Sequence, residues 1–392
     1  MIDSTGFGDG RTTALSSGRT MFMLDSFSGN PIVTPSALGL TCRVNGLARD
    51  GAVFNPGAAL FHDRIVLMPR IHTGYKKNVL LHSILPLKRF LFQNYVSRVW
   101  PLVSTDGIHF ARLGDSLLTG EGEEHADFVH GLEDTRIIPF RDRFLIVGTG
   151  KINPPFRGNG NDDRIAIYST SDFESFDYHG VPLDVQSRNT IPFVDEDTGR
   201  VFMLLRFPPE KHIYMQELSG GVDQLCNPAR YQGDWQAIFS NRKRNVLLRG
   251  GILPHEREKV GAGPPAIKTE RGWLLIYRGV GYVSEEIARA YGLRSALKRA
   301  YVITSALLDK DDPARVLRRS TLPVYVPNAP YELQGGSGYQ VEAPRVCFPS
   351  GIVSHQGKIL LYCGAGDKYT VLLTCAQDAL IDHLLEHGES PA

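Results

Sequence analysis

Pairs of short apolar runs recur along the chain, and a tight turn separates the two runs of each pair. The second run of a pair begins at an Asp or Gly turn residue in five places, over residues 63–71, 142–150, 199–207, 272–280 and 357–365. Another apolar run ends just before each turn, as in "EDTRIIPFR" ahead of Asp142. A strand, a tight turn and a second strand are typical of a β-hairpin. The pattern therefore predicts five β-hairpins.

Further apolar runs that end in turn residues follow these hairpins, for example over 97–107 and 164–173, so each unit is predicted to be a small antiparallel sheet. Five such sheets favour an all-β fold, a five-bladed β-propeller, in which radial repetition protects the sheet edges. A β-sandwich with coincidental turns is the alternative. We predict one catalytic propeller domain over 21–392 and a flexible tail over 1–20, which is rich in Gly, Ser and Thr and has no periodicity.

Two segments have apolar residues at helical spacing. Residues 284–300 begin with a Ser-Glu-Glu start and interrupt the fourth unit between its second and third strands. We therefore expect a helical insertion in blade four, at the rim or over the mouth of the propeller, and a candidate contact in a homo-oligomer. Residues 376–388 are predicted to form a C-terminal helix that braces the fold.

Composition excludes several classes of partner. The 43 basic and 42 acidic residues give a formal charge of +1, so no basic excess indicates nucleic acid. No apolar run approaches the roughly 20 residues that span a bilayer, and the start lacks the order of a signal peptide, so no membrane partner is expected. The five scattered cysteines fit buried thiols in a reducing compartment. These observations predict a cytoplasmic protein.

Polar residues gather at one end of the predicted strands. In a propeller the first strand of each blade lines the central channel, so the leading ends of these strands converge at one mouth. Those ends carry Asn55, Glu133, Asp134, Arg188, Asn189, Lys259 and Ser350, and the second strands end with or precede Arg70, Arg206, Arg278 and Asp367. A ring of cations around an acid indicates an anion site, because the guanidinium group fits phosphate bidentately. For any single arginine, an ion-paired brace between blades is the alternative.

Several motifs resemble those of glycoside hydrolase family 130. They are, in chain order, "FNPGAAL", "EDTRI", "GAGPPAIKTERGWLLIYRGV", "ALLDKDDPARVLRRS", "YELQGG", "FPSGIV" and "YCGAGD". The resemblance extends from about residue 30 to 380 and implies a five-bladed propeller. It also implies inverting phosphorolysis of a β-mannoside, such as mannosyl-glucose or a short β-manno-oligosaccharide, by inorganic phosphate, with α-mannose 1-phosphate as product.

The resemblance assigns roles to individual residues. Asp134 matches the general acid of the family, and the resemblance implies that it delivers its proton through a sugar hydroxyl. The phosphate-binding residues would be Arg188, Arg206, Lys259 and Arg278, and the substrate-binding residues would be Asn55, Arg70, Asp106, Glu133 and Asp367. Asp106 equally fits a plain turn residue, since Asp-Gly is a tight-turn pair. Tyr277, Tyr331 and Trp273 are candidates for sugar stacking, although strand aromatics usually pack within blades.

Asp134 has to be protonated to act as an acid, and we expect the crowded, like-charged Glu133 to raise its pKa while Arg136 opposes this. The sequence departs from the family pattern in two places. Thr135 replaces a usual proline, and Arg278 stands where a histidine normally assists phosphate. The second change adds a fixed charge to the anion site and leaves the substrate subgroup open.

Two other functions remain open. A hydrolase on the same scaffold would pair Asp134 with a second carboxylate such as Glu342 or Glu332, since inverting hydrolysis needs a base-activated water. A non-catalytic carbohydrate-binding propeller would use the acids as hydrogen-bond acceptors. Phosphorolysis needs no base, because phosphate is already a charged nucleophile. We therefore expect a phosphorylase with inorganic phosphate as co-substrate, no other cofactor and no metal.

Overall fold

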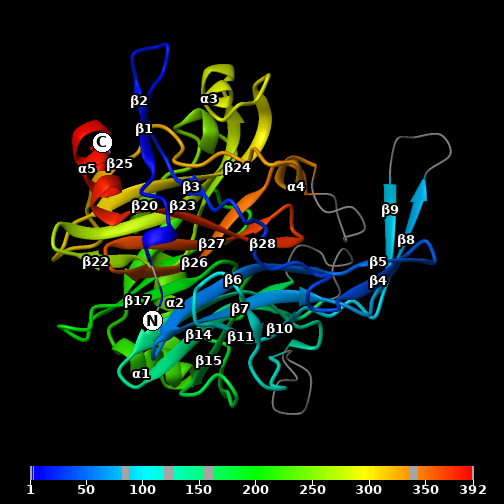
Figure 1. Ribbon diagram of the computed structural model, residues 1–392. Coiled ribbons are helices and arrows are strands. Elements are labelled where there is room, and N and C mark those ends of the chain that lie inside the picture. Colours follow the sequence, from blue (N-terminus) through cyan, green and yellow to red (C-terminus); the bar gives the residue numbers. More distant parts are fainter. Residues whose placement is uncertain are drawn as a thin grey trace.

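The computed structural model describes residues 2, 4–81, 88–118, 128–153, 162–334 and 343–390 (Figure 1). The fold is all-β, as predicted. Five antiparallel sheets of four or five strands, numbered I to V in chain order, follow one another along the chain. Sheet I contains β6 (Ala52–Phe61), β7 (Arg64–His72), β10 (Arg98–Val99), β11 (Leu102–Ser104) and β12 (Ala111–Arg112). Sheet II contains β13 (Leu132–Phe140), β14 (Arg143–Lys151), β15 (Asp163–Thr170) and β16 (Asp177–Gly180).

The remaining three of these sheets have the same plan. Sheet III contains β17 (Ile191–Val194), β18 (Val201–Leu205), β19 (Ile213–Glu217) and β20 (Val246–Leu248). Sheet IV contains β21 (Lys259–Ala262), β22 (Ile267–Thr269), β23 (Gly272–Val283), β24 (Leu297–Leu308) and β25 (Val316–Arg319). Sheet V contains β26 (Cys347–His355), β27 (Lys358–Ala365), β28 (Tyr369–Ala376) and, from near the N-terminus, β3 (Asp25–Ser26).

All five predicted hairpins are confirmed. Each of them joins the first two strands of its sheet, and in sheet II the pairing Phe140↔Arg143 lies next to the turn that contains Asp142. In sheet IV the first strand is divided into β21 and β22, which both pair with β23. The hairpin pattern was readable because turn residues and strand periodicity are local features of the sequence.

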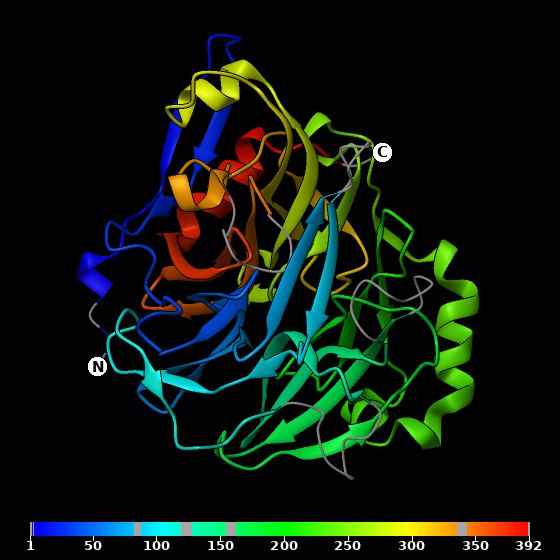
Figure 2. The same ribbon diagram turned by 90° about the vertical axis from the view of Figure 1, so that its right-hand side faces the viewer.

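The five sheets are arranged around one another. Strand β6 contacts both β13 and β26, β13 contacts β17, β19 contacts β21, and β23 contacts β26. Each sheet therefore touches the next, and sheet V touches sheet I. Figure 2 shows the same order, with the chain running around the molecule from blue to red. Among the described strands, no sheet closes on itself into a barrel.

Two smaller sheets lie outside these five. Strand β1 (Arg11–Ala14) pairs with β2 (Thr20–Met23). Strands β4 (Thr41–Val44), β5 (Leu47–Asp50), β8 (Lys76–Leu81) and β9 (Lys88–Gln93) form a sheet that projects from the rest of the molecule (Figure 1). The predicted flexible tail over 1–20 is wrong for the described residues, because 11–14 form a paired strand and Phe7 is buried in the core beside Leu67 and Tyr362.

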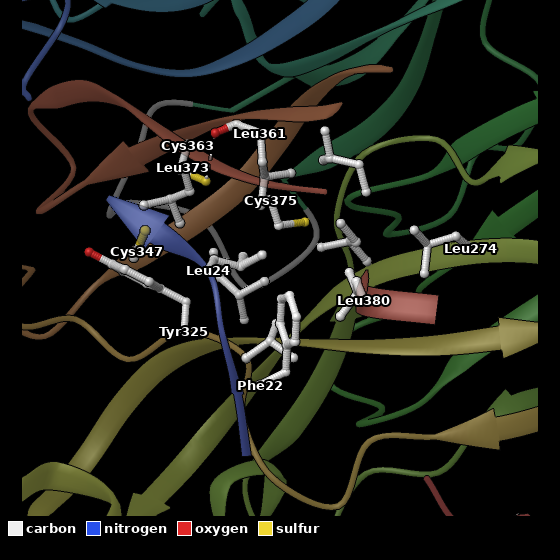
Figure 3. Close-up of a cluster of buried hydrophobic side chains, with 14 of the residues drawn as sticks. Phe22, Leu24, Leu274, Tyr325, Cys347, Leu361, Cys363, Leu373, Cys375 and Leu380 are labelled. Carbon is white, nitrogen blue, oxygen red and sulfur yellow. Dashed lines mark hydrogen bonds between the residues drawn. The ribbon is translucent and has the colours of Figure 1, made fainter. Parts of the chain in front are cut away.

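A hydrophobic core joins sheets IV and V to both ends of the chain. Figure 3 shows members of this cluster: Leu274 of sheet IV, Leu361 and Leu373 of sheet V, Phe22 of β2 and Leu380 of the C-terminal helix. Cys347, Cys363 and Cys375 are free, buried thiols in this cluster. Burial of the N-terminal strand and the C-terminal helix in one core fixes the last sheet against the first residues of the chain.

The predicted helix over 284–300 is only partly correct. Helix α3 covers Glu285–Ala290, with Ser284 accepting a hydrogen bond from the Ile287 backbone N–H as N-cap. Just beyond the helix, Gly292 has φ +75° and allows the Leu293 N–H to reach the Ala288 carbonyl. From Leu297 the chain continues as strand β24.

The predicted C-terminal helix is confirmed as α5 (Gln377–His387). The α-helices that the sequence pattern missed are α1 (Gly221–Cys226), α2 (Gln232–Asn241) and α4 (Pro330–Leu333). The 3₁₀-helices are η1 (Ser4–Gly6), η3 (Pro228–Tyr231), η4 (Arg242–Arg244) and η5 (Pro254–Glu256). No helix in the described part of the chain has the length and apolar character needed to cross a membrane.

Candidate active site

A polar cavity of about 710 Å³ lies where the five sheets meet. Nine of the ten predicted site residues line it: Asn55, Arg70, Glu133, Asp134, Arg188, Arg206, Lys259, Arg278 and Asp367. They come from all five sheets or the loops next to them. The predicted convergence of strand ends on one opening is therefore found for these nine residues.

Unusual backbone conformations direct several of these side chains into the cavity. Asn55, Asp134, Asn189 and Asp367 have φ between +50° and +56°. At Asn55 and Asp134 the strand pairing also shifts register, between Phe54 and Gly57 in β6 and between Glu133 and Arg136 in β13. A bulge of this kind re-aims a side chain, and Asn and Asp tolerate the left-handed conformation better than other non-glycine residues. The residue types at these positions therefore agree with the local geometry.

Glycine at position 57 allows β6 and β13 to approach each other closely. A Cβ atom at Gly57 would lie only 2.9 Å from the Thr135 carbonyl oxygen. Thr135, which replaces the usual proline, donates its hydroxyl to the Met68 carbonyl at 2.8 Å. The two bulged strands are thus held side by side, and Asn55 Nδ2 donates to Asp134 Oδ1 at 2.8 Å.

Glu133 and Asp134 are buried and ion-paired with two arginines. Arg70 Nη2 lies 2.6 Å from Glu133 Oε1, and Arg188 Nη2 lies 2.6 Å from Glu133 Oε2. The contacts to Asp134 are longer, 3.7 Å from Arg70 and 3.4 Å from Arg188. Burial raises the pKa of Glu133, but Arg70 and Arg188 outweigh it and lower this pKa to about 2.

The expected raised pKa of Asp134 is wrong for this arrangement of charges. Burial does raise the pKa, and the negative charge of Glu133 does so as well. Arg188 and Arg70 together outweigh both effects and hold the pKa of Asp134 below its usual value. Asp134 is therefore a carboxylate in this structure, with its charge shared between two guanidinium groups.

Arg136 acts on the backbone rather than on the carboxylates. It is almost completely buried, its Nε donates to the Gly263 carbonyl at 2.7 Å, and its Nη1 donates to the Asp134 carbonyl at 2.7 Å. Hydrogen bonds from a charged donor to buried carbonyls stabilise a fold strongly. Arg136 thus links sheet II to sheet IV and holds the bulge that presents Asp134.

We expect Arg136→Met to lower the free energy of unfolding by roughly 3 kcal/mol or more, because the buried carbonyls of Gly263, Asp134 and Thr135 lose their charged donor. Urea denaturation followed by circular dichroism measures this change. Arg143→Met is the control, since Arg143 is half-exposed in a surface ion pair and its loss should cost less than about 1 kcal/mol. Equal stabilities of the two variants would contradict the proposed role of Arg136.

Besides the exposed Arg345, three cations of the cavity have no ion-pair partner among the described residues: Arg206, Lys259 and Arg278. Arg278 Nη2 donates to Asn189 Oδ1 at 2.7 Å, its Nη1 donates to the Ala262 carbonyl, and its guanidinium group stacks on Phe348. Arg206 makes a long hydrogen bond of 3.4 Å to the same Asn189 oxygen. Burial lowers the pKa of all three groups, and neighbouring cations lower it further. Buried charge without a counter-ion is unfavourable, so this end of the cavity favours an anion.

Asn189 and Tyr301 are among the cavity residues that were not assigned a role from the sequence. Asn189 connects the anion-binding end to the acid, because its Oδ1 accepts from Arg206 and Arg278 and its Nδ2 lies 3.5 Å from Asp134 Oδ2. Its position next to Arg188 was the available signal. Tyr301 lies beneath Lys259, whose Nζ is 5.5 Å from the ring centroid. It was missed because the residues just before it were predicted as helix.

Asp106 is the one predicted site residue that does not line the cavity, and its assignment as a sugar contact stays a prediction. Its side chain is half-exposed and Oδ1 accepts from the backbone N–H groups of Ile108 and His109 at 2.9 and 2.8 Å. Ser104 donates to the same oxygen. Asp106 therefore closes a turn, the alternative that the Asp-Gly pair allowed.

The other candidates that the structure describes do not line the cavity either. Glu332 is buried and accepts hydrogen bonds from the Asn328 and Ala329 backbone and from Tyr325, so it holds a loop. Glu342 lies outside the described residues. Trp273 and Tyr277 are buried in sheet IV, and Tyr331 packs against Tyr369. In the described ranges no group of three or more His, Cys, Asp or Glu side chains is placed to hold a metal.

Comparisons with known proteins show what this chain is similar to. A family model described as beta-1,4-mannooligosaccharide phosphorylase matches residues 29–386. A "Beta-1,2-mannobiose phosphorylase" of Thermoanaerobacter sp. is 27% identical over 357 residues, covering 89% of this chain and 96% of the relative. A "1,2-beta-oligomannan phosphorylase" of the same strain is 26% identical over 326 residues, 78% of this chain and 92% of the relative. The solved structure of a β-1,2-mannobiose phosphorylase from Listeria innocua has a similar fold, with a TM-score of 0.64, 18% identity, and coverage of 93% and 99% of the two chains.

Proposed function

The chain belongs to glycoside hydrolase family 130, and we propose on this basis that it is an inverting β-mannoside phosphorylase. It would cleave a β-mannosidic bond with inorganic phosphate and release α-mannose 1-phosphate. The similar proteins named above are phosphorylases of mannobiose or oligomannan. The names of these relatives give β-1,2 linkages and the family description gives β-1,4 linkages, which supports short β-manno-oligosaccharides as the substrate class. Mannosyl-glucose stays a candidate from the motif resemblance alone.

We also propose that sheets I to V are the blades of a five-bladed β-propeller that forms a single catalytic domain. The contacts that lead from each sheet to the next and from sheet V back to sheet I support this arrangement. Pairing of β3 with β28 brings an N-terminal strand into the last blade. The first strands β6, β13 and β21 all contribute residues to the cavity, as the innermost strands of a propeller do.

The observation that carries the proposed function is the group of three cations, Arg206, Lys259 and Arg278, without a carboxylate partner among the described residues. A dianion such as phosphate would neutralise them and would receive fixed hydrogen-bond donors. A hydrolase would have no use for this local excess of positive charge. With Arg188 at its edge, the cation group can hold phosphate as the nucleophile of an in-line displacement.

The reaction then needs one proton donor. A phosphate oxygen forms a bond to C1 of the mannosyl group while the bond from C1 to the leaving oxygen breaks, and Asp134 supplies the proton that this oxygen receives. Asn55, Arg70, Glu133 and Asp367 surround Asp134 and are proposed to bind the sugar. Inorganic phosphate is the only co-substrate in this scheme. The free cysteines and the requirement for phosphate favour a cytoplasmic location.

We expect α-mannose 1-phosphate to be released from β-1,2-mannobiose, β-1,4-mannobiose or mannosyl-glucose only when phosphate is present. ³¹P NMR of the reaction mixture detects this product and its anomeric configuration. Release of free mannose at the same rate without phosphate would identify a hydrolase. Binding of these sugars without any turnover would identify a carbohydrate-binding protein.

A further inference from the structure

Arg188 is shared between the anion-binding end of the cavity and the proposed acid. Its Nη2 lies 2.6 Å from Glu133 Oε2 and 3.4 Å from Asp134 Oδ2, and its Nη1 lies 3.5 Å from Asp163 Oδ2. The side chain also lines the same cavity as Arg206, and its positive charge contributes to the lowered pKa of Arg206. A dianion bound at Arg206 would therefore lie within the field of Arg188.

The charge state of Asp134 creates a requirement for the reaction. The burial of this carboxyl raises its pKa, but Arg188 and then Arg70 lower it by more, so the group is ionised before substrate binds. An ionised carboxylate has no proton to donate. If Asp134 is the acid, its protonation has to accompany the binding of substrate or phosphate.

We propose that binding of a dianion in this cavity is coupled to uptake of a proton by Asp134, because the dianion and Asp134 compete for the guanidinium group of Arg188. This inference rests on the proposed function. The bound dianion would accept hydrogen bonds from Arg188 and would reduce the electrostatic stabilisation that Arg188 gives to the Asp134 carboxylate. The negative charge of the dianion would also favour the neutral form of Asp134. Phosphate would then serve both as nucleophile and as the ligand that prepares the acid.

Asn189 provides a second connection between the two ends of the cavity. Its Oδ1 accepts hydrogen bonds from Arg278 and Arg206, and its Nδ2 is directed to Asp134 Oδ2 at 3.5 Å. A dianion that accepts hydrogen bonds from these arginines would change the hydrogen bonds of the Asn189 side-chain amide. The coupling therefore does not depend on Arg188 alone.

Other charged and polar groups also face Asp134. They are Asn55 from β6, Arg70 and His72 from β7, Glu133 and Arg136 from β13, Arg278 from β23 and Asp367 from the turn between β27 and β28. Asp367 is the competing proton acceptor, since burial raises its pKa to about 6. Unlike Asp134, it forms no ion pair with Arg188 among the described residues. A variant at Asp367 therefore separates the two carboxyl groups.

The sign of the pH dependence follows from proton linkage. When binding takes up a proton, affinity for the dianion rises as the pH falls, over the range between the pKa of Asp134 in the free protein and its higher pKa in the complex. Phosphate itself titrates near neutral pH and would obscure this effect. Sulfate is the better probe, because it remains a dianion throughout the useful pH range.

Isothermal titration calorimetry with sulfate, at about pH 6 in buffers of different ionisation enthalpy, measures the protons taken up on binding. We expect uptake of a substantial fraction of one proton by the unmodified protein and by Asp367→Asn, and none by Asp134→Asn. Infrared spectroscopy of the unmodified protein and of Asp367→Asn should show a protonated carboxyl band appear when sulfate is added. This second measurement does not require the Asp134 variant to fold.

Sulfate binding without proton uptake, or equal uptake by Asp134→Asn, would overturn the coupling and leave the proposed phosphorylase intact. Loss of uptake in Asp367→Asn alone would also overturn it, by assigning the proton to Asp367. Failure of both sulfate and phosphate to bind would instead overturn the anion site on which the proposed function and the coupling both depend.

Discussion

Replacing Asp134 by asparagine is expected to lower kcat for phosphorolysis by roughly 10²- to 10⁴-fold, the contribution of a positioned general acid. Asparagine keeps the size of the side chain and tolerates the φ of +52° at this position, so the bulge in β13 should persist. It cannot donate the proton that the leaving sugar oxygen requires. Steady-state rates of mannose 1-phosphate formation and a circular dichroism spectrum measure the two expectations.

Substrates with different leaving groups distinguish loss of the general acid from a general loss of active-site structure. An aryl β-mannoside with an acidic phenol as leaving group needs little protonation, so Asp134→Asn should retain far more activity on it than on mannobiose. Asp106→Asn is the matched control, because Asp106 lies in a turn outside the cavity, and its kcat on mannobiose should be unchanged. Full activity of Asp134→Asn on mannobiose would remove Asp134 from the mechanism.

The sequence predicts the scaffold well because the signals of the scaffold are local. The turn at Asp142 and the apolar runs on either side of it identify one hairpin without reference to the rest of the chain. The same locality explains the helix error. Residues 284–300 have helical spacing, but the helix ends before Gly292 and pairing with β23 makes a strand of Leu297 onward. Such pairing across a sheet is not visible in a single segment.

The sequence predicts which residues form the site but not the charge states of those residues. The repeat and the family resemblance together place Asp134, Arg188 and Arg206 at one opening, and all three line the cavity. The charge on Asp134 depends on distances of 3.4 and 3.7 Å to arginines on other sheets, which the sequence does not contain. Asn189 was placed at the opening but given no role for a related reason, since its importance comes from the two guanidinium groups that meet at its side-chain oxygen.

Replacing Arg206 by alanine is expected to raise the KM for phosphate by roughly 10- to 100-fold, since a hydrogen bond from a charged group contributes about 1.5–3 kcal/mol. Arg206 is nearly buried, and its Nε has no hydrogen-bond partner, so its donors are available to a bound anion. The KM for the mannoside should change much less, because Arg206 belongs to the cation group and not to the residues around Asp134. Initial rates over a matrix of phosphate and mannobiose concentrations separate the two constants.

The melting temperature distinguishes an arginine that binds an anion from an arginine that stabilises the fold. Burial and repulsion from Arg188 lower the pKa of Arg206, so its charge is disfavoured in the folded protein without an anion. Arg206→Ala should therefore melt at the same temperature as the unmodified protein or higher when phosphate is absent, and it should lose the stabilisation that phosphate gives to the unmodified protein. Arg143→Ala, a half-exposed arginine in a surface ion pair, should keep both the KM and the phosphate effect. A lower melting temperature for Arg206→Ala with an unchanged KM for phosphate would make Arg206 a brace between sheets and would contradict the anion site.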